Sequence, residues 1–146
     1  MRIAIGCDHR GLEIKRAVMN LLEDLGHTPD DCGAFSIEAV DYPDIAAKVG
    51  KKVTGGGAAQ GILICGTGIG MSIAANKMSG IRAALCYDIF TATRARAHNN
   101  ANILCLGAET VPDMILQIVE AFLNTAFEGG RHQRRLDKIT GLECRP

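Results

Sequence analysis

The chain has 146 residues, which is enough for one domain of ordinary size but not for two. Lys and Arg together number 16, as do Asp and Glu, and the resulting formal net charge of zero argues against a protein that mainly binds nucleic acids or membranes. With 4 Phe, 2 Tyr and no Trp, surfaces for base stacking are scarce, and the core must be built from aliphatic side chains.

Short apolar runs alternate along the chain with longer segments of helical periodicity. In chain order, the pattern predicts a strand at 2–7, a helix at 12–25, a weak edge strand at 27–33, a helix at 44–53, a strand at 61–65, a helix at 71–77, a strand at 81–86, a helix at 88–97, a strand at 103–106, a helix from Pro112 and a last helix after Gly130. Strands separated by helices form parallel β-α-β units. We therefore expect one doubly wound, Rossmann-like α/β domain over residues 1–146, with helices flanking a five-stranded parallel sheet.

Reactive side chains gather after two of the predicted strands. In sheets of this kind, ligands bind outside the carboxyl ends of the strands, near the point where the strand order reverses. The first strand ends at Cys7, which Asp8 and His9 follow, and the strand at 61–65 leads into a glycine-rich loop at 66–70. We expect the chemistry of the protein at these two strand ends.

The loop Gly66-Thr67-Gly68-Ile69-Gly70 leaves its backbone N–H groups accessible at the start of a helix, an arrangement that suits an anion such as phosphate. A tight turn that only packs a strand on a helix is the structural alternative. The dinucleotide-binding fingerprint is a competitor, although its third glycine would fall on Met71. No Gly-Lys-Ser/Thr sequence ends the loop, which excludes a P-loop.

Cys65 immediately precedes this loop. A thiol at the end of a strand and beside a helix N-terminus lies where the thiolate is favoured. It could then act as a nucleophile or as a general base, unless it is one more core thiol. The six cysteines form no Cys-x-x-Cys pair, and we find no signal-peptide or transmembrane pattern. We therefore expect a cytoplasmic protein with reduced thiols.

Two further segments carry candidate residues. Arg131 and Arg135 are four residues apart on a predicted helix, so they share a face and could clamp a phosphate. A solvated helix face is the alternative for these arginines. His98 and Asn99 end another predicted helix, where a lone histidine is commonly a helix-terminal cation rather than a catalytic group.

Several segments together resemble one known family. They are GCDHRG at the start of the chain, DYPD near position 41, ICGTGIGMSIAANK in the middle, HNNAN at 98–102 and EGGRHQRR at 128–135. These segments are similar to those of the type B ribose-5-phosphate isomerases, whose superfamily includes the subunits of galactose-6-phosphate isomerase. The match runs in order and spacing over essentially the whole chain.

The resemblance implies an aldose–ketose isomerase of the pentose phosphate pathway, which interconverts ribose 5-phosphate and ribulose 5-phosphate through a cis-enediolate without metal or organic cofactor. It implies that Cys65 is the base that carries a proton between C2 and C1, that His98 assists ring opening, and that Thr67 either assists ring opening or holds a sugar hydroxyl. The implied substrate contacts are Asp8, His9, Tyr42, Gly66, Gly68, Ile69, Gly70, Asn99, Arg131 and Arg135. The resemblance also implies a homodimer or a dimer of dimers with shared active sites, in which the C-terminal helix makes dimer contacts and His98, Asn99 and the arginines serve the partner's pocket.

The chain departs from the family pattern after the last predicted strand. Members commonly have a phosphate-binding arginine there in a Gly-x-Arg context, whereas this chain has Gly107-Ala108-Glu109, and the next segment, 110–112, is one residue short. Either the phosphate is held more weakly, by His9, Arg131 and Arg135 alone, or the substrate is a hexose 6-phosphate of the allose or galactose type. A third alternative is that Glu109 is an exposed residue without a role in binding. A non-catalytic module that binds a sugar phosphate or a dinucleotide is the alternative from another class.

Overall fold

Five strands form one parallel sheet in the computed structural model, which describes residues 1–109 and 112–143. The strands are β1 (Arg2–Cys7), β2 (Thr28–Asp31), β3 (Gln60–Cys65), β4 (Ala83–Leu85) and β5 (Ile103–Gly107). Their order is β2-β1-β3-β5-β4, and every neighbouring pair is parallel. The predicted five-stranded parallel sheet is confirmed, and the weak strand lies at an edge, as its low hydrophobicity predicts.

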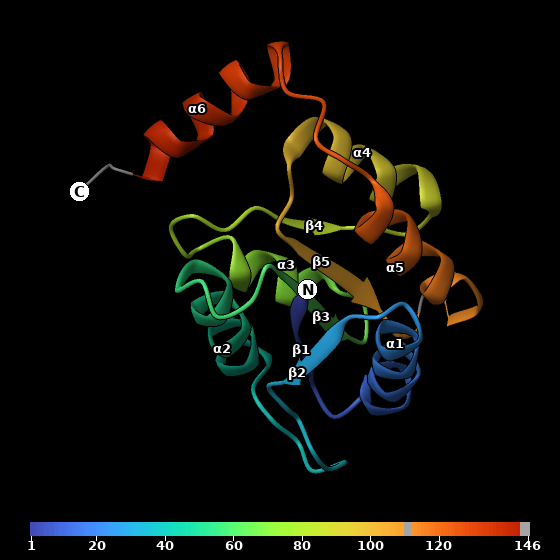
Figure 1. The fold of residues 1–146 in the computed structure, drawn as a ribbon. Coiled ribbons are helices and arrows are strands. Elements are labelled where there is room, and N and C mark those ends of the chain that lie inside the picture. The colour runs from blue at the N-terminus through green and yellow to red at the C-terminus, as the bar shows by residue number, and fades with distance from the viewer. Residues whose placement is uncertain (110–111, 144–146) are drawn as a thin grey trace.

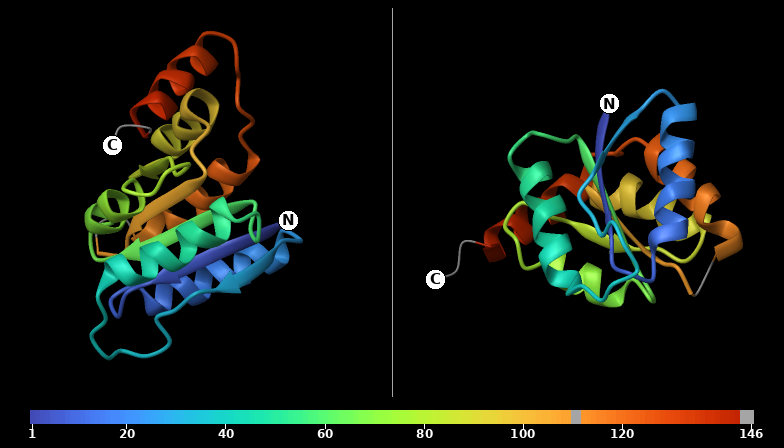
Figure 2. Two further views of the ribbon diagram at one scale, coloured as in Figure 1. Left: turned by 90° about the vertical axis from the view of Figure 1, so that its left-hand side faces the viewer. Right: turned by 90° about the horizontal axis from the view of Figure 1, so that it is seen from below.

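Helices cover both faces of the sheet (Figures 1 and 2). One face packs against α1 (Leu12–Asp24), α4 (Ile89–Asn99) and α5 (Ile115–Asn124), and the other against α2 (Tyr42–Thr54) and α3 (Ile69–Ala75). Alternation along β3 sends Ile62 and Ile64 into the first core and Leu63 and Cys65 into the second. The doubly wound α/β architecture is therefore confirmed. No helix of the described chain is both long and apolar enough to cross a membrane.

The bounds of several elements differ from the predicted ones for local reasons. The helix α3 begins two residues before the predicted start, because Gly68 adopts a left-handed φ of 77° and turns the chain directly into the helix. Pro112 opens a short 3-10 turn, Pro112–Met114, rather than α5 itself. β4 is three residues long instead of six, since it pairs with β5 only over that length. Thr110 and Val111, in the segment predicted to be one residue short, lie outside the described residues.

The last helix, α6 (Arg131–Glu143), extends away from the sheet and lies beside α4 (Figures 1 and 2). Only His132 and Leu136 of its described side chains are buried, whereas Ile139 and Leu142 are 40% and 60% exposed. A cleft of about 710 Å³ lies between α6, α4 and the β4 edge of the sheet. The helix thus has little contact with the body of its own chain.

The strand order creates a crevice at the centre of the sheet. β1 and β3 are neighbours, but the chain leaves β1 towards β2 on one side and leaves β3 towards β4 on the other. Connections that diverge in this way leave a space at the carboxyl ends of the two strands. The register pairs Cys7 with Ile64, so the segments that follow Cys7 and Cys65 emerge side by side.

Candidate active site

A cavity of about 420 Å³ lies at the carboxyl ends of β1 and β3. It is lined by Asp8, Arg10, Tyr42, Cys65, Gly66, Thr67, Ile69, Gly70 and Ile73. Seven of these nine residues are among the candidates predicted from the sequence, whereas Arg10 and Ile73 are not. The larger cleft beside α6 contains neither Cys65 nor the glycine loop, so the candidate chemistry lies in the smaller cavity.

The thiol of Cys65 is buried at this cavity, with 5% of the residue exposed. The backbone N–H of Gly68 donates a hydrogen bond to Cys65 Sγ over 3.1 Å. The left-handed conformation of Gly68 folds the chain back so that this N–H meets the sulfur. The sulfur therefore accepts a hydrogen bond, the role that a thiolate fills better than a thiol.

Three other cysteines lie in a different environment. Burial raises the pKa of both Cys7 and Cys86 to about 11, and it also raises the pKa of Cys105. These three thiols therefore stay protonated near neutral pH and pack as small hydrophobic side chains. Cys65 differs from them because it lines a cavity and receives a backbone hydrogen bond.

The glycine loop packs closely against the start of α2. A Cβ atom added to Gly70 would lie 2.6 Å from Cζ of Tyr42, so only glycine lets the tyrosine ring lie over the loop. The N–H of Ile69 donates to Thr67 Oγ1 over 3.3 Å, which fixes an exposed hydroxyl at the cavity. This packing defines one wall of the site.

Asp8 and His9 follow β1 but lie differently. Asp8 is buried, lines the cavity and accepts a hydrogen bond from the backbone N–H of Arg10 over 2.9 Å. His9 is half-buried and is not among the lining residues. Its Nδ1 is buried and has no hydrogen-bond partner among the described residues. The structure thus brings Asp8 to the cavity, whereas His9 does not line it.

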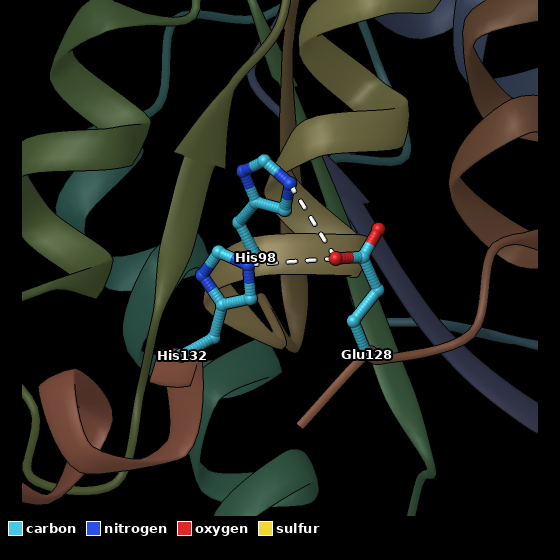
Figure 3. Close-up of side chains that lie close together, drawn as sticks. All are labelled: His98, Glu128 and His132. Atoms are coloured by element: carbon cyan, nitrogen blue, oxygen red, sulfur yellow. Dashed lines mark ion pairs between the residues drawn. The ribbon is translucent and has the colours of Figure 1, made fainter. Parts of the chain in front are cut away.

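The remaining candidates, His98, Asn99, Arg131 and Arg135, lie on α4 and α6 and do not line the cavity of Cys65. His98 stacks on His132, with ring centroids 4.2 Å apart and an angle of 12° between the planes. Figure 3 shows both rings beside the carboxylate of Glu128, which precedes α6. Within one chain, the candidate residues therefore form two separate groups.

His132 and Glu128 are absent from the sequence-derived candidates, although the segment EGGRHQRR contains both. Oε2 of Glu128 lies 3.4 Å from His132 Nε2 and 3.8 Å from His98 Nε2. The three ligand atoms are within 4.8 Å of one another. The nearly parallel rings, however, keep their in-plane lone pairs in two stacked planes, which do not converge on one point between them. The geometry thus fits a contact that holds α6 on α4 better than a metal site.

The His98–His132 contact predicts a pH-dependent stability. Burial lowers the pKa of His132, and the charges of His98, Arg131 and Arg135 act in the same direction against that of Glu128. As the pH falls below the ordinary value of 6.5, the unfolded chain takes up this proton before the folded chain does. We expect urea denaturation to show that acidification destabilises the wild type more than His132→Gln. If the two proteins lost stability equally on acidification, His132 would not be the origin of the pH dependence.

Residues 3–139 match the family model for ribose/galactose isomerases. Ribose-5-phosphate isomerase B of Escherichia coli is 45% identical over 145 residues, which cover 99% of this chain and 97% of that protein. The structure of ribose-5-phosphate isomerase B from Clostridium thermocellum matches with a TM-score of 0.96 and 47% identity, covering 98% of this chain and 97% of that one. The Mycoplasma genitalium structure with bound ribulose-5-phosphate matches with a TM-score of 0.94 and 44% identity, covering 99% and 97%.

Proposed function

The chain belongs to the ribose/galactose isomerase family, and on this premise we propose that it interconverts ribose 5-phosphate and ribulose 5-phosphate. Residues 1–146 then form a single sugar-phosphate isomerase domain. The observation that carries the proposal is the buried thiol of Cys65, which meets the N–H of Gly68 at the central crevice of the sheet. A cytoplasmic location fits an enzyme whose described cysteines are all free.

The reaction moves one proton between adjacent carbons. The thiolate of Cys65 removes the proton from C2 of the open-chain aldose, which leaves a cis-enediolate. The proton of the C2 hydroxyl then passes to O1, and the thiol of Cys65 returns its proton to C1, which gives the ketose. Base and substrate thus regain their starting charges at the end of the cycle. The N–H groups of the Gly66–Gly70 loop stabilise the developing negative charge on the enediolate oxygens. This chemistry requires no metal and no organic cofactor.

A second copy of the chain completes the site in this proposal. His98 and Asn99 serve ring opening and sugar binding in the cavity of a partner subunit, and Arg131 and Arg135 hold the phosphate there. Their separation from Cys65 within one chain supports such sharing. The exposed apolar side chains of α6 and the cleft beside it supply a surface that a partner can cover.

Shared sites predict complementation between two defective chains. We expect Cys65→Ala homodimers to be inactive. Homodimers of the double variant Arg131→Ala/Arg135→Ala should be nearly inactive when the substrate concentration is limiting. Co-expressed with different tags and purified as a heterodimer, the two chains should regain about half of the wild-type activity, since one of two symmetric sites is intact. If the heterodimer is as inactive as its parents, the site does not cross the interface.

The reaction itself is tested with purified protein and no added metal or nucleotide. Ribose 5-phosphate, allose 6-phosphate and galactose 6-phosphate are compared at equal concentrations, with ketose formation as the measured quantity. We expect turnover of ribose 5-phosphate. Turnover of a hexose phosphate alone would favour the alternative that Glu109 suggests, in which the same mechanism acts on a hexose 6-phosphate. Failure on all three substrates would favour a non-catalytic binding module.

A further inference from the structure

Arg10, which lines the Cys65 cavity, forms an ion pair with Glu109. Arg10 Nη1 lies 3.2 Å from Oε1 and 3.5 Å from Oε2 of Glu109. The two residues follow β1 and β5, the strands on either side of β3, so the pair crosses over the end of β3. A Cβ atom added to Gly66 would lie 3.2 Å from Arg10 Nη1 and 3.3 Å from Glu109 Cδ. The pair therefore rests against the residue that follows Cys65.

The backbone of each partner is anchored to the site. The N–H of Arg10 donates to Asp8 Oδ1 over 2.9 Å, and the N–H of Glu109 donates to the carbonyl oxygen of Gly66 over 3.0 Å. The two side chains nevertheless remain 57% and 54% exposed. The guanidinium is thus held at the cavity mouth while it stays accessible to a ligand.

Arg10 is the one cationic side chain among the described residues that line this cavity. Asp8 is the one carboxyl side chain among the described lining residues. Within residues 1–109 and 112–143, only Nη1 of the guanidinium has a hydrogen-bond partner in a side chain. The N–H groups of Nε and Nη2 therefore remain as donors for an anion.

We infer that Arg10 binds the phosphate group of the sugar phosphate and that Glu109 is a positioning residue that holds the guanidinium over the cavity. The inference rests on the proposed function. A phosphate that leaves water needs a cation beside it, and the free edge of a guanidinium can bind phosphate oxygens in a bidentate manner. A carboxylate at position 109 would repel phosphate by itself, but here Arg10 neutralises it.

The test compares Arg10→Gln with Arg16→Gln, which removes an exposed arginine of α1 instead. Arg10→Gln should weaken the binding of inorganic phosphate, measured by isothermal titration calorimetry, on the order of 10- to 100-fold, the effect of losing a charge-assisted hydrogen bond. The KM for ribose 5-phosphate should rise by a similar factor while kcat changes by less than about threefold. Arg16→Gln should alter none of these quantities.

The role of Glu109 is tested by asking whether the effect of Glu109→Ala on phosphate binding reverses when Arg10 is replaced. With Arg10 present, Glu109→Ala should weaken phosphate binding about fivefold, because the guanidinium loses its orientation. In the Arg10→Gln background the same substitution should strengthen phosphate binding, because an unpaired carboxylate repels the ligand. A residue that only supports the fold produces no such inversion. Stronger phosphate binding by Glu109→Ala with Arg10 present would overturn the positioning role.

The outcomes separate this inference from the proposed function. If Arg10→Gln binds phosphate as tightly as the wild type, Arg10 is not a phosphate ligand, whichever sugar the chain converts. If the wild type fails to convert ribose 5-phosphate, the proposed function fails. Loss of phosphate binding in Arg10→Gln alone would still support the role of Arg10 in that case.

Discussion

The substitution Cys65→Ala is expected to lower kcat for ribose 5-phosphate by about 10²–10⁴-fold, the range that a positioned acid or base contributes. The alanine side chain cannot accept the C2 proton, and no other described cysteine lines the cavity. The glycine loop keeps its backbone contacts, because the carbonyl of Cys65 accepts from Ala108 N–H and that of Gly66 from Glu109 N–H. Substrate affinity should therefore change little.

The matched control for this substitution is Cys105→Ala. Cys105 lies on the neighbouring strand β5 and packs in the same core as Cys65, but it is fully buried. Steady-state kinetics should show near wild-type kcat for the control, and calorimetry should show that Cys65→Ala still binds ribose 5-phosphate. Loss of ligand binding together with turnover would indicate that Cys65 supports the structure of the loop rather than the chemistry.

The substitution Gly68→Ala is expected to lower the free energy of unfolding by about 2–4 kcal/mol, from the left-handed backbone and overpacking together. An added Cβ would lie 2.5 Å from Leu85 Cδ1 and 2.9 Å from the carbonyl carbon of Leu106, and backbone cannot move as a side-chain tip does. Relief of the clash would shift the Gly68 N–H away from Cys65 Sγ. We therefore expect kcat to fall as well.

The control Gly26→Ala separates the cost of the left-handed backbone from the cost of overpacking. Gly26 has a φ of 78°, nearly that of Gly68, but nothing lies within 4 Å of an added Cβ. This control should cost about 1 kcal/mol, the effect of the backbone conformation alone, and should leave kcat unchanged. Urea denaturation of the two variants measures the difference. Equal losses of stability would show that the contacts with Leu85 and Leu106 relax without cost.

The fold could be predicted where the information is local. Apolar runs and helical periods identify the strands and helices, and the low hydrophobicity of 27–33 correctly predicts an edge strand. The strand order could not be predicted, because nothing near β4 or β5 in the sequence specifies that β5 inserts between β3 and β4. Some helices and strands begin or end at other residues than predicted because of the local backbone conformation. The helix α3, for example, begins directly after the left-handed Gly68.

The candidate site also contains a part that the local sequence predicts and a part that it does not. Cys65, Thr67 and the loop glycines are contiguous in sequence, so one motif identifies most of the cavity wall. The pair between Arg10 and Glu109 joins residues 99 positions apart and depends on the order of β1, β3 and β5. The stacking of His98 on His132 likewise depends on how α6 returns to α4. Such contacts follow from tertiary topology and carry no local signal.

The strand order also determines when each strand can pair with its neighbours while the chain is being synthesised. β2, β1 and β3 are neighbours and all lie within the first 65 residues, so they can pair as soon as they leave the ribosome. β4 has no strand to pair with until β5 follows it. The hydrogen bonds from Ala108 to Cys65 and from Glu109 to Gly66 also form only then. A nascent chain that stops before β5 thus contains Cys65 but lacks the backbone groups of Ala108 and Glu109 that bind Cys65 and Gly66.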